Sequence, residues 1–293
     1  MNNKTGNRTR RNDKTAKILS TVFLLIIAAL YIYNTYLAEP HTDVVEGVCE
    51  FHFIDVGQGD CSLFLTDSNA VVIDAGPKSE AEETTDYIRE YTDSLDYFIL
   101  THPDEDHIGG AIEIIGKLNV RNIIMSDASK DTQIFTKLLD AIEEKNITVI
   151  KAKPGSEYSA GDIKLTVLAP IGEFDDYNDY SVVTRVRYGS TSVIVAGDAE
   201  KTSEKNMVES YGRALRSDIL KLAHHGSSTS TGKEFFETVS PKYAIISCGK
   251  NNSYGHPHEE TLKLLDKYGV KYYRTDKEGS IIMTSDGKKI DKK

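Results

Sequence analysis

The sequence predicts an α/β protein with two sheets packed face to face and helices outside both, a four-layer αββα sandwich preceded by one N-terminal transmembrane helix. Two observations predict the sandwich. Apolar segments of strand length alternate with helical segments in two successive runs, and each run opens with strands. A third observation predicts the transmembrane helix, since residues 18–38 carry no charge and are long enough to cross a bilayer.

The N-terminal segment has the pattern of a membrane anchor, because a basic tail comes before the uncharged run. We divide the chain into a basic cytoplasmic tail (1–17), a transmembrane anchor (18–38), a linker (39–48) and a globular domain (49–293). A cleaved signal peptide and a buried helix are the alternatives, but Tyr36 is too bulky for the third position before a cleavage at Glu39. We therefore expect a single-pass protein of the cell membrane with its domain outside the cell.

Strands and helices of the first run follow from apolar alternation and turn signals. Strands are predicted at 50–56, 61–66 and 70–74, a helix with an acidic first turn at 79–91, a buried strand at 95–101, and then helices near 107–117 and 132–145 alternating with strands near 120–125 and 147–150. The second run repeats this order. Its predicted strands lie at 163–170, 181–189, 191–198, 217–223, 243–247, 271–275 and 280–284, and its helices at 200–211, 232–239 and 259–268.

Charge and cysteine content limit the possible functions. The net charge is −10 for the whole chain, and about −15 without the basic tail, so the surface does not attract polyanions by bulk charge. Cys49, Cys61 and Cys248 are odd in number and lie in apolar, strand-like contexts. They are expected to be buried free thiols, and no disulfide framework is implied.

Histidines cluster at predicted strand ends. Six of the eight histidines fall in three short loops, namely His102 and His107, His224 and His225, and His256 and His258. Solvated loop histidines would scatter along the chain, whereas these coincide with aspartate and glycine where strands deliver side chains to one rim. Metal binding explains this clustering better.

The stretch "THPDEDHIGG", residues 101–110, shows the chemistry most clearly. His102, Asp104, Asp106 and His107 let one tight turn offer imidazoles and carboxylates to two adjacent cations. The alternative is an acidic helix N-terminus, where carboxylates favour the helix dipole. We accept that alternative for Glu105 alone.

Seven motifs in order carry a family resemblance: "FIDVGQGD", "VIDAG", "HPDEDHIGG", "NDYSVV", "AGDAE", "HHGS" and "YGHP". Over residues 49–285 the chain resembles the metallo-β-lactamase superfamily, and within it the hydrolase domain of ComEC-like competence DNA-uptake proteins. The resemblance implies two divalent metal ions, manganese or zinc. It implies the metal ligands His102, Asp104, Asp106, His107, Asp198 and His225, with Asp198 bridging both ions.

Asp104 stands where most of the superfamily has a second histidine, a change that the ComEC-like branch shares. An oxygen ligand there makes the site harder and shifts its preference from zinc toward manganese. The resemblance also implies supporting residues around the ligands, namely Asp55, Asp60, Asp74 and His224. For His224 the alternative is a packing role. For the segment "DVGQGD", which contains Asp55 and Asp60, the alternative is a phosphate-cradling glycine turn, but the signal for it is weak.

Substrate contacts are assigned to Asn178 and Ser227, and catalytic roles to Asp106 and His256. Asn178 occupies roughly the place of another histidine ligand, and a loop Asx-turn explains it equally well. His256, in a Gly-His-Pro turn, is a candidate phosphate contact or general acid. His258 is expected to begin the next helix. Ser227 and Ser228 belong to the ligand loop and are not expected to be nucleophiles.

The predicted function is therefore a membrane-anchored, outward-facing, binuclear metal-dependent hydrolase of phosphodiester bonds, by resemblance a nuclease acting on DNA. Its partners would be that substrate and the membrane, and no protein partner is deducible. Two alternatives stay open: a phosphodiesterase on a small or surface ester such as phosphorylcholine, which the acidic surface favours over a nuclease, and a metal-free scaffold of the same fold. A single predicted span excludes DNA import by this chain alone.

Overall fold

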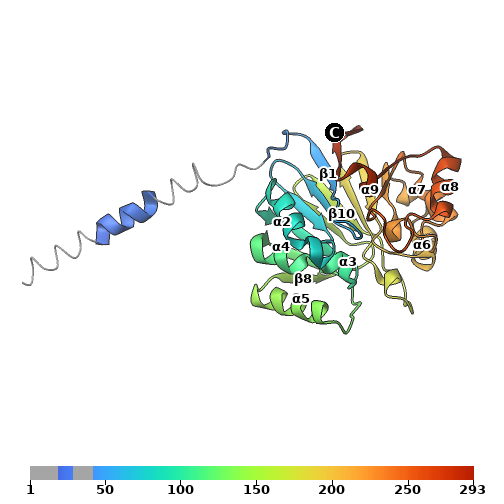
Figure 1. The fold of residues 1–293 in the computed structure, drawn as a ribbon. Helices are drawn as coiled ribbons and strands as arrows, with labels where there is room; N and C mark the ends of the chain where they lie inside the picture. Colours follow the sequence, from blue (N-terminus) through green and yellow to red (C-terminus); the bar gives the residue numbers. More distant parts are fainter. Residues whose placement is uncertain (1–18, 29–41) are drawn as a thin grey trace, which may run out of the picture. The chain divides into compact units, whose positions relative to one another are not determined.

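The structure is a computed structural model that describes residues 19–28 and 42–293. Residues 19–28 form a helix (Figure 1), while the rest of the predicted anchor over 18–38, the basic tail over 1–17 and the linker up to residue 41 lie outside the described residues. Within the two described ranges, no helix is long and apolar enough to cross a membrane. The globular unit Thr42–Lys293 is described by itself below.

The first sheet has the strand order β17-β16-β1-β2-β3-β5-β7-β8. Its strands are β1 (Cys49–Phe53), β2 (Ser62–Leu65), β3 (Ala70–Ile73), β5 (Tyr97–Leu100), β7 (Asn122–Met125), β8 (Thr148–Lys151), β16 (Ile281–Ser285) and β17 (Ile290–Lys292). Strands β3, β5, β7 and β8 run parallel, and the remaining neighbours pair antiparallel. The predicted C-terminal strand over 280–284 is confirmed as β16, but it pairs with β1 of the first run.

The second sheet has the order β15-β14-β13-β12-β11-β10-β9. Its strands are β9 (Glu157–Ala160), β10 (Ile163–Val167), β11 (Thr184–Tyr188), β12 (Thr191–Val195), β13 (Ile219–Lys221), β14 (Tyr243–Ile246) and β15 (Lys271–Arg274), and a separate small pair joins β4 (Ser94–Leu95) to β6 (Asn119–Val120). Strands β12 to β15 are parallel. The carboxyl ends of parallel strands share one edge of a sheet, so the loops after them meet there.

Helices connect the strands. They are η2 (Lys78–Glu80), α2 (Ala81–Arg89), α3 (Glu105–Ile108), α4 (Ala111–Lys117), α5 (Gln133–Glu144), η3 (Asn178–Tyr180), α6 (Lys201–Tyr211), η4 (Gly212–Leu215), η5 (Ala223–Gly226), α7 (Lys233–Val239), α8 (Glu259–Tyr268) and α9 (Thr275–Glu278). The helix predicted near 107–117 is two helices, α3 and α4. They are separated at Gly109, where a Cβ atom would lie 2.2 Å from the backbone nitrogen of Lys78.

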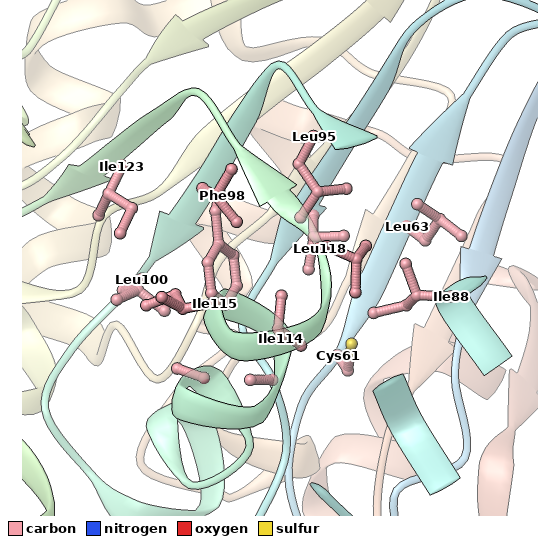
Figure 2. Close-up of a cluster of buried hydrophobic side chains, with 14 of the residues drawn as sticks. Cys61, Leu63, Ile88, Leu95, Phe98, Leu100, Ile114, Ile115, Leu118 and Ile123 are labelled. Atoms are coloured by element: carbon pink, nitrogen blue, oxygen red, sulfur yellow. The ribbon is translucent and has the colours of Figure 1, made fainter. Parts of the chain in front are cut away.

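Three buried clusters show that the layers are helix, sheet, sheet, helix. Neighbouring residues of one strand point to opposite faces, so Leu63 packs with α2, α4 and α5 while Phe64 faces the other sheet. In the second sheet Ile219 belongs to the cluster between the sheets, and Leu220 packs with α6, α7 and α8. Figure 1 shows α2, α4 and α5 as one group of helices and α6, α7 and α8 as another. Figure 2 shows the cluster that contains Leu63, between α4 and the strands of the first sheet. The predicted αββα sandwich is confirmed.

Candidate metal centre

The first metal loop begins where β5 ends and continues into α3. Thr101 and His102 follow the strand directly, and His107 lies in the short helix. Both imidazoles are buried, with 3% of His102 and 0% of His107 exposed, and their ring centroids lie 4.2 Å apart. The parallel strand therefore delivers both rings to the rim of the first sheet.

Asp74, which follows β3, fixes the orientation of these rings. Its Oδ1 accepts the backbone N–H of Thr101 at 2.9 Å, and its Oδ2 accepts the hydroxyl of Thr101 and Nδ1–H of His107, both at 2.8 Å. Since the hydroxyl of Thr101 donates to Asp74, it accepts from Nδ1–H of His102 at 3.1 Å. These hydrogen bonds orient both rings with Nε2 toward the centre. Supporting carboxylates orient ligand imidazoles in the same way in metal sites.

Asp198 faces these rings from the second sheet. It follows β12, and its Oδ1 lies 3.1 Å from Nε2 of His107 while its Oδ2 lies 3.9 Å from Nε2 of His102. The backbone N–H of Asp198 donates to the hydroxyl of Ser181 at 3.1 Å, which holds the turn after the strand. The Asp198 carboxylate from the second sheet thus meets the imidazoles of His102 and His107 from the first sheet in one buried group.

A second group forms around His225, in the loop after β13. Its Nε2 lies 3.2 Å from Asp106 Oδ2 and 3.7 Å from Asp198 Oδ2, and its Nδ1 lies 3.1 Å from the carbonyl oxygen of Ser247. His224 and His225 both have left-handed backbone, with φ of 49° and 54°. Such strain costs about 1–3 kcal/mol per residue and is typical of functional sites.

Potential ligand atoms fall into groups whose members lie within 4.8 Å of one another. These groups are His102, His107 and Asp198; Asp106, His107 and His225; Asp60, Asp198 and His225; and Asp60, Asp74 and His107. Asp198 and His107 each belong to more than one group. The sharing is what two adjacent metal ions require, so the bridging role assigned to Asp198 from the sequence fits the geometry.

The pKa values reflect the mutual stabilisation of these charges. Burial opposes protonation of His225, but the carboxylates of Asp198 and Asp60 outweigh it and raise the pKa of His225 to about 9. The pKa of His107 is likewise held well above its ordinary value, because Asp198 and other carboxylates outweigh burial. Burial alone would raise the pKa of Asp198, yet the imidazoles of His107 and His225 hold it well below its ordinary value.

Several buried polar atoms of this centre lack hydrogen-bond partners. Within the described part of the chain, His102 Nε2, His107 Nε2 and Asp198 Oδ1 are buried atoms without a hydrogen-bond partner, and the 3.1 Å approach of the last two lacks hydrogen-bond geometry. Buried polar atoms are ordinarily paired. Imidazole nitrogen and carboxylate oxygen are the donor types of zinc and manganese sites, so the residues fit divalent ions.

Sequence reasoning missed Lys221, which lies at the end of β13 and is fully buried. Its ammonium group forms an ion pair with Asp60 Oδ2, and Asp60 Oδ1 lies 3.3 Å from Nδ1 of His225. The signal was a single charge inside the apolar segment "ILKLA". Lys221 thus compensates the buried charge of Asp60, and the supporting role of Asp60 stays a prediction.

The glycine turn of "DVGQGD" also supports the metal loop. The backbone N–H of Asp60 donates to the carbonyl oxygen of Asp106 at 3.1 Å, and a Cβ atom on Gly59 would lie 2.4 Å from that oxygen. Gly59 has φ of +155°, which L side chains rarely adopt. A side chain there would push the turn away from Asp106. The turn therefore needs glycine for close approach of two backbones.

Two predicted residues point elsewhere. The Asp104 carboxylate, predicted as a ligand, accepts the ammonium of Lys130 at 2.8 Å and does not join the ligand groups of the described residues. Asp55, predicted as a support, is exposed, and its Oδ1 accepts the backbone N–H of Gly57 at 3.2 Å. The side chain of Asp55 points away from the centre because it accepts a hydrogen bond within its own turn. The side chain of Asp104 points away because it pairs with Lys130, 26 positions downstream.

The predicted substrate contacts have structural partners. The backbone N–H of Asn178 donates to Asp176 Oδ1 at 2.9 Å, an Asx-turn made by the side chain of Asp176, so the role of the Asn178 side chain stays a prediction. The hydroxyl of Ser227 lies 3.0 Å from that of Thr229, and Ser227 is buried. This partner lies two positions away in the same turn, and the substrate contact predicted for Ser227 stays a prediction.

His224 and His256 lie beside the centre. His224 Nε2 lies 3.8 Å from Asp198 Oδ2, and its Nδ1 lies 3.3 Å from Glu200 Oε1. The ring of His256 lies 5.5 Å from that of His224 and 6.0 Å from that of His225. Burial, together with positive charge on His225 and His224, lowers the pKa of His256 to about 4, so its ring is neutral at pH 7. It must gain a proton before acting as an acid.

His258 begins α8, as predicted, because it is the residue immediately before the helix. Its Nδ1 accepts the backbone N–H of Ser228 at 2.9 Å, and its Nε2 lies 3.2 Å from the carbonyl oxygen of Tyr254. These two contacts tie the "HHGSS" loop to the loop that carries His256.

The sandwich and its shared His/Asp groups define a metal-binding protein of the metallo-hydrolase type. The sequence profile of the Metallo-beta-lactamase superfamily matches residues 54–250, so this chain belongs to that superfamily. The predicted family is confirmed.

Relatives among competence proteins support the ComEC-like resemblance. ComE operon protein 3 of Bacillus subtilis (strain 168) is 33% identical over 294 residues, which cover 91% of this chain and 35% of that protein. Competence protein ComA of Neisseria gonorrhoeae and Recombination protein 2 of Haemophilus influenzae are each 29% identical over 78% of this chain, covering 31% and 28% of their own lengths. The chain thus corresponds to a minor part of each relative.

Solved structures share the fold. The metallo-beta-lactamase fold protein YhfI from Bacillus subtilis has a TM-score of 0.56 and 15% identity, covering 81% of this chain and 100% of that chain. Igni18, a metallo hydrolase from the archaeon Ignicoccus hospitalis, has a TM-score of 0.56 and 16% identity, covering 80% of this chain and 98% of that chain. At these identities the likeness concerns the fold alone.

Proposed function

We propose that this protein is a binuclear metal-dependent phosphodiesterase that acts on DNA, anchored in the cell membrane with its domain outside the cell. One observation carries the proposal: Asp198 joins His102 and His107 in one buried group and Asp60 and His225 in another. A carboxylate shared in this way is the arrangement of two-metal hydrolytic sites, which commonly cleave phosphate esters.

The chain's residues would prepare the site, and the ions, manganese or zinc, would activate a water molecule and polarise a phosphoryl oxygen. Asp74 and Thr101 hold the rings of the first loop in place, so that little rearrangement is needed on binding. The carbonyl oxygen of Ser247 orients His225 in the same way. His256, whose ring lies beside those of His224 and His225, would contact a phosphate group.

The choice of DNA rests on the relatives, two of which are named a competence protein and a recombination protein. Membrane anchoring rests on the uncharged run over 18–38 after its basic flank. A small or surface phosphodiester is the second candidate, and the net charge of −10 favours it, because nucleases ordinarily present a basic track.

Metal content and hydrolysis test the proposal together. The full chain would be purified with manganese, and its metal measured by elemental analysis. It would then be assayed with manganese, zinc or chelator on single- and double-stranded DNA and on bis(p-nitrophenyl) phosphate. We expect about two ions per chain and hydrolysis that chelator abolishes. Asp198→Ala should lower the occupancy of both sites because it removes the shared ligand.

Asp198→Asn removes the charge with little change of shape, and Asp286→Asn is its matched control. Asp286 lies in the exposed turn between β16 and β17, where its Oδ1 accepts the backbone N–H groups of Lys288 and Lys289. An unchanged metal content in Asp198→Ala would refute the bridging assignment. A wild-type chain inactive with every metal would favour the metal-free scaffold, and activity on the small diester without activity on DNA would favour the second candidate.

A further inference from the structure

Tyr254 presents an exposed aromatic ring beside the metal centre. It is 66% exposed, and its ring lies 5.6 Å from that of His256 at an interplanar angle of 19°. The ring of His256 in turn lies 6.0 Å from that of His225 at 31°. The rings of His225, His256 and Tyr254 therefore follow one another at small interplanar angles. His225 is a predicted metal ligand, and Tyr254 is the ring exposed to solvent.

The loop that carries Tyr254 is held in place. The side-chain amide of Asn252 donates to the carbonyl oxygens of Gly249 and His256, at 2.9 and 2.7 Å, and its Oδ1 accepts the backbone N–H of His256 at 2.9 Å. Lys250 lies exposed in the same loop. The tyrosine is thus presented by an ordered turn, which lowers the entropic cost of binding a ligand.

Tyr177 presents a second ring near the first metal loop. It is 47% exposed, and the ammonium of Lys130 lies 6.0 Å from its ring centroid and 2.8 Å from Asp104 of the metal loop. Its loop is braced by the hydroxyl of Tyr180, which accepts the backbone N–H of Phe174 at 3.0 Å. Tyr177 therefore has a lysine ammonium near its ring, and Lys250 lies in the same loop as Tyr254.

The exposed rings can provide affinity for nucleic acid that the surface charge does not provide. A chain with a net charge of −10 gains little affinity for a polyanion from bulk electrostatics. Stacking of bases on aromatic rings supplies affinity without net charge, and every base has a face to stack. Only unpaired bases expose that face, because the bases of a duplex are stacked on one another.

We propose that Tyr177 and Tyr254 are stacking platforms for unpaired nucleobases, so that the site binds single-stranded nucleic acid in preference to duplex. This inference rests on the proposed phosphodiesterase function and names the form of its substrate. The platforms lie beside the first metal loop and beside His256, so a strand stacked on both would pass the metal centre with its backbone exposed to it.

A choline-type ester fits these rings less well. Quaternary ammonium groups bind where several aromatic faces surround one point. Here Tyr177 already faces the ammonium of Lys130, whose charge repels a second cation, while Tyr254 stacks on His256. The ammonium of Lys130 beside Tyr177 and the exposed Lys250 in the loop of Tyr254 favour an anionic ligand that carries its own aromatic groups, which is the chemistry of a nucleic-acid strand.

Binding by the chelator-treated full chain tests the proposal without hydrolysis. Fluorescence anisotropy would compare a labelled oligo-dT strand, an abasic strand of the same length and a duplex. We expect the wild type to prefer oligo-dT to both others. Tyr177→Ala and Tyr254→Ala should each weaken oligo-dT binding by about 5- to 100-fold and leave abasic binding unchanged. Tyr177→Phe and Tyr254→Phe should retain binding, since phenylalanine keeps the ring.

Tyr268→Ala is the matched control, because Tyr268 is an exposed tyrosine on α8 that packs on Phe236 away from the ligand loops. Equal wild-type binding of oligo-dT and abasic strands, tighter duplex binding, equal losses in Tyr268→Ala or no binding of oligo-dT would each overturn the proposal. Hydrolysis of bis(p-nitrophenyl) phosphate, which has no base, is scored separately. Base-dependent binding without that hydrolysis supports the platforms and refutes the proposed function, and hydrolysis without base-dependent binding does the reverse.

Discussion

Replacing Lys221 with methionine should destabilise the domain by about 3–5 kcal/mol, because it leaves a buried carboxylate without its charge partner. Lys221 is 0% exposed, and its ammonium pairs with Asp60, which is 2% exposed. Methionine retains most of the apolar stem, so the loss comes from the charge and little from packing. His225 Nδ1 lies 3.3 Å from Asp60 and compensates part of the charge, which favours the lower end of the range.

The effect should depend on pH in a defined direction. Burial would raise the pKa of Asp60, but Lys221 and His225 outweigh it and hold that pKa below its ordinary value. A depressed carboxyl pKa stabilises the fold above the unfolded-state pKa of about 4, and this stabilisation is lost as pH falls through the folded pKa. Without Lys221 the pKa of Asp60 should rise. The deficit of Lys221→Met should therefore shrink as pH falls from 7 toward about 4, where Asp60 becomes protonated.

Urea unfolding followed by circular dichroism in chelator measures this difference, and 3 kcal/mol corresponds to a fall in Tm of about 6–12 °C for a domain of this size. Lys242→Met is the control, because Lys242 forms an exposed ion pair with Asp218 at 2.8 Å, with a lysine side chain that is 72% exposed. Surface pairs contribute about 0–1 kcal/mol. Equal losses in both variants, with unchanged m values, would refute the claim that Asp60 depends on Lys221.

Three further predictions concern metal binding, catalysis and location. Manganese affinity should rise with pH toward about 9, because the pKa of His225 is raised to about 9 and its imidazole must lose a proton to bind an ion. Calorimetry in two buffers would detect the released proton. An affinity that does not change with pH would contradict this prediction. His256→Ala should lower turnover about 10²–10⁴-fold on a phosphodiester with a poor leaving group, and much less with nitrophenolate, if His256 protonates the leaving oxygen; equal losses at unchanged metal content would make it a phosphate contact. In cells the full chain should fractionate with membranes and expose its domain to protease on intact protoplasts, whereas a soluble product beginning near Glu39 would show cleavage.

The fold class and the order of elements could be predicted because local patterns encode them. The period of apolar residues in 133–144 and the short apolar run in 62–65 depend on neighbours a few positions away, and both predicted elements are present within a residue or two. Strands β9 and β17 escaped prediction. They are short edge strands whose polar and exposed residues give little alternation to detect.

The sequence by itself also determined the core of the candidate site. His102 and His107 follow one predicted strand, and Asp198 and His225 follow two others. Since the carboxyl ends of parallel strands share an edge, their side chains meet even though they are distant in the chain. The family resemblance assigned these four residues as ligands, and the structure brings all four into the ligand groups.

Only the tertiary structure decided the partners of individual charges. Lys221 pairs with Asp60 across 161 positions, and Lys130 binds Asp104 across 26. The strand β16 joins β1 of the first run, although it follows the second. A strand pattern fixes which face a side chain occupies, but the atom opposite it depends on which strands and loops are neighbours in space. Pairings of this kind are set by sheet order and register, which no local pattern encodes.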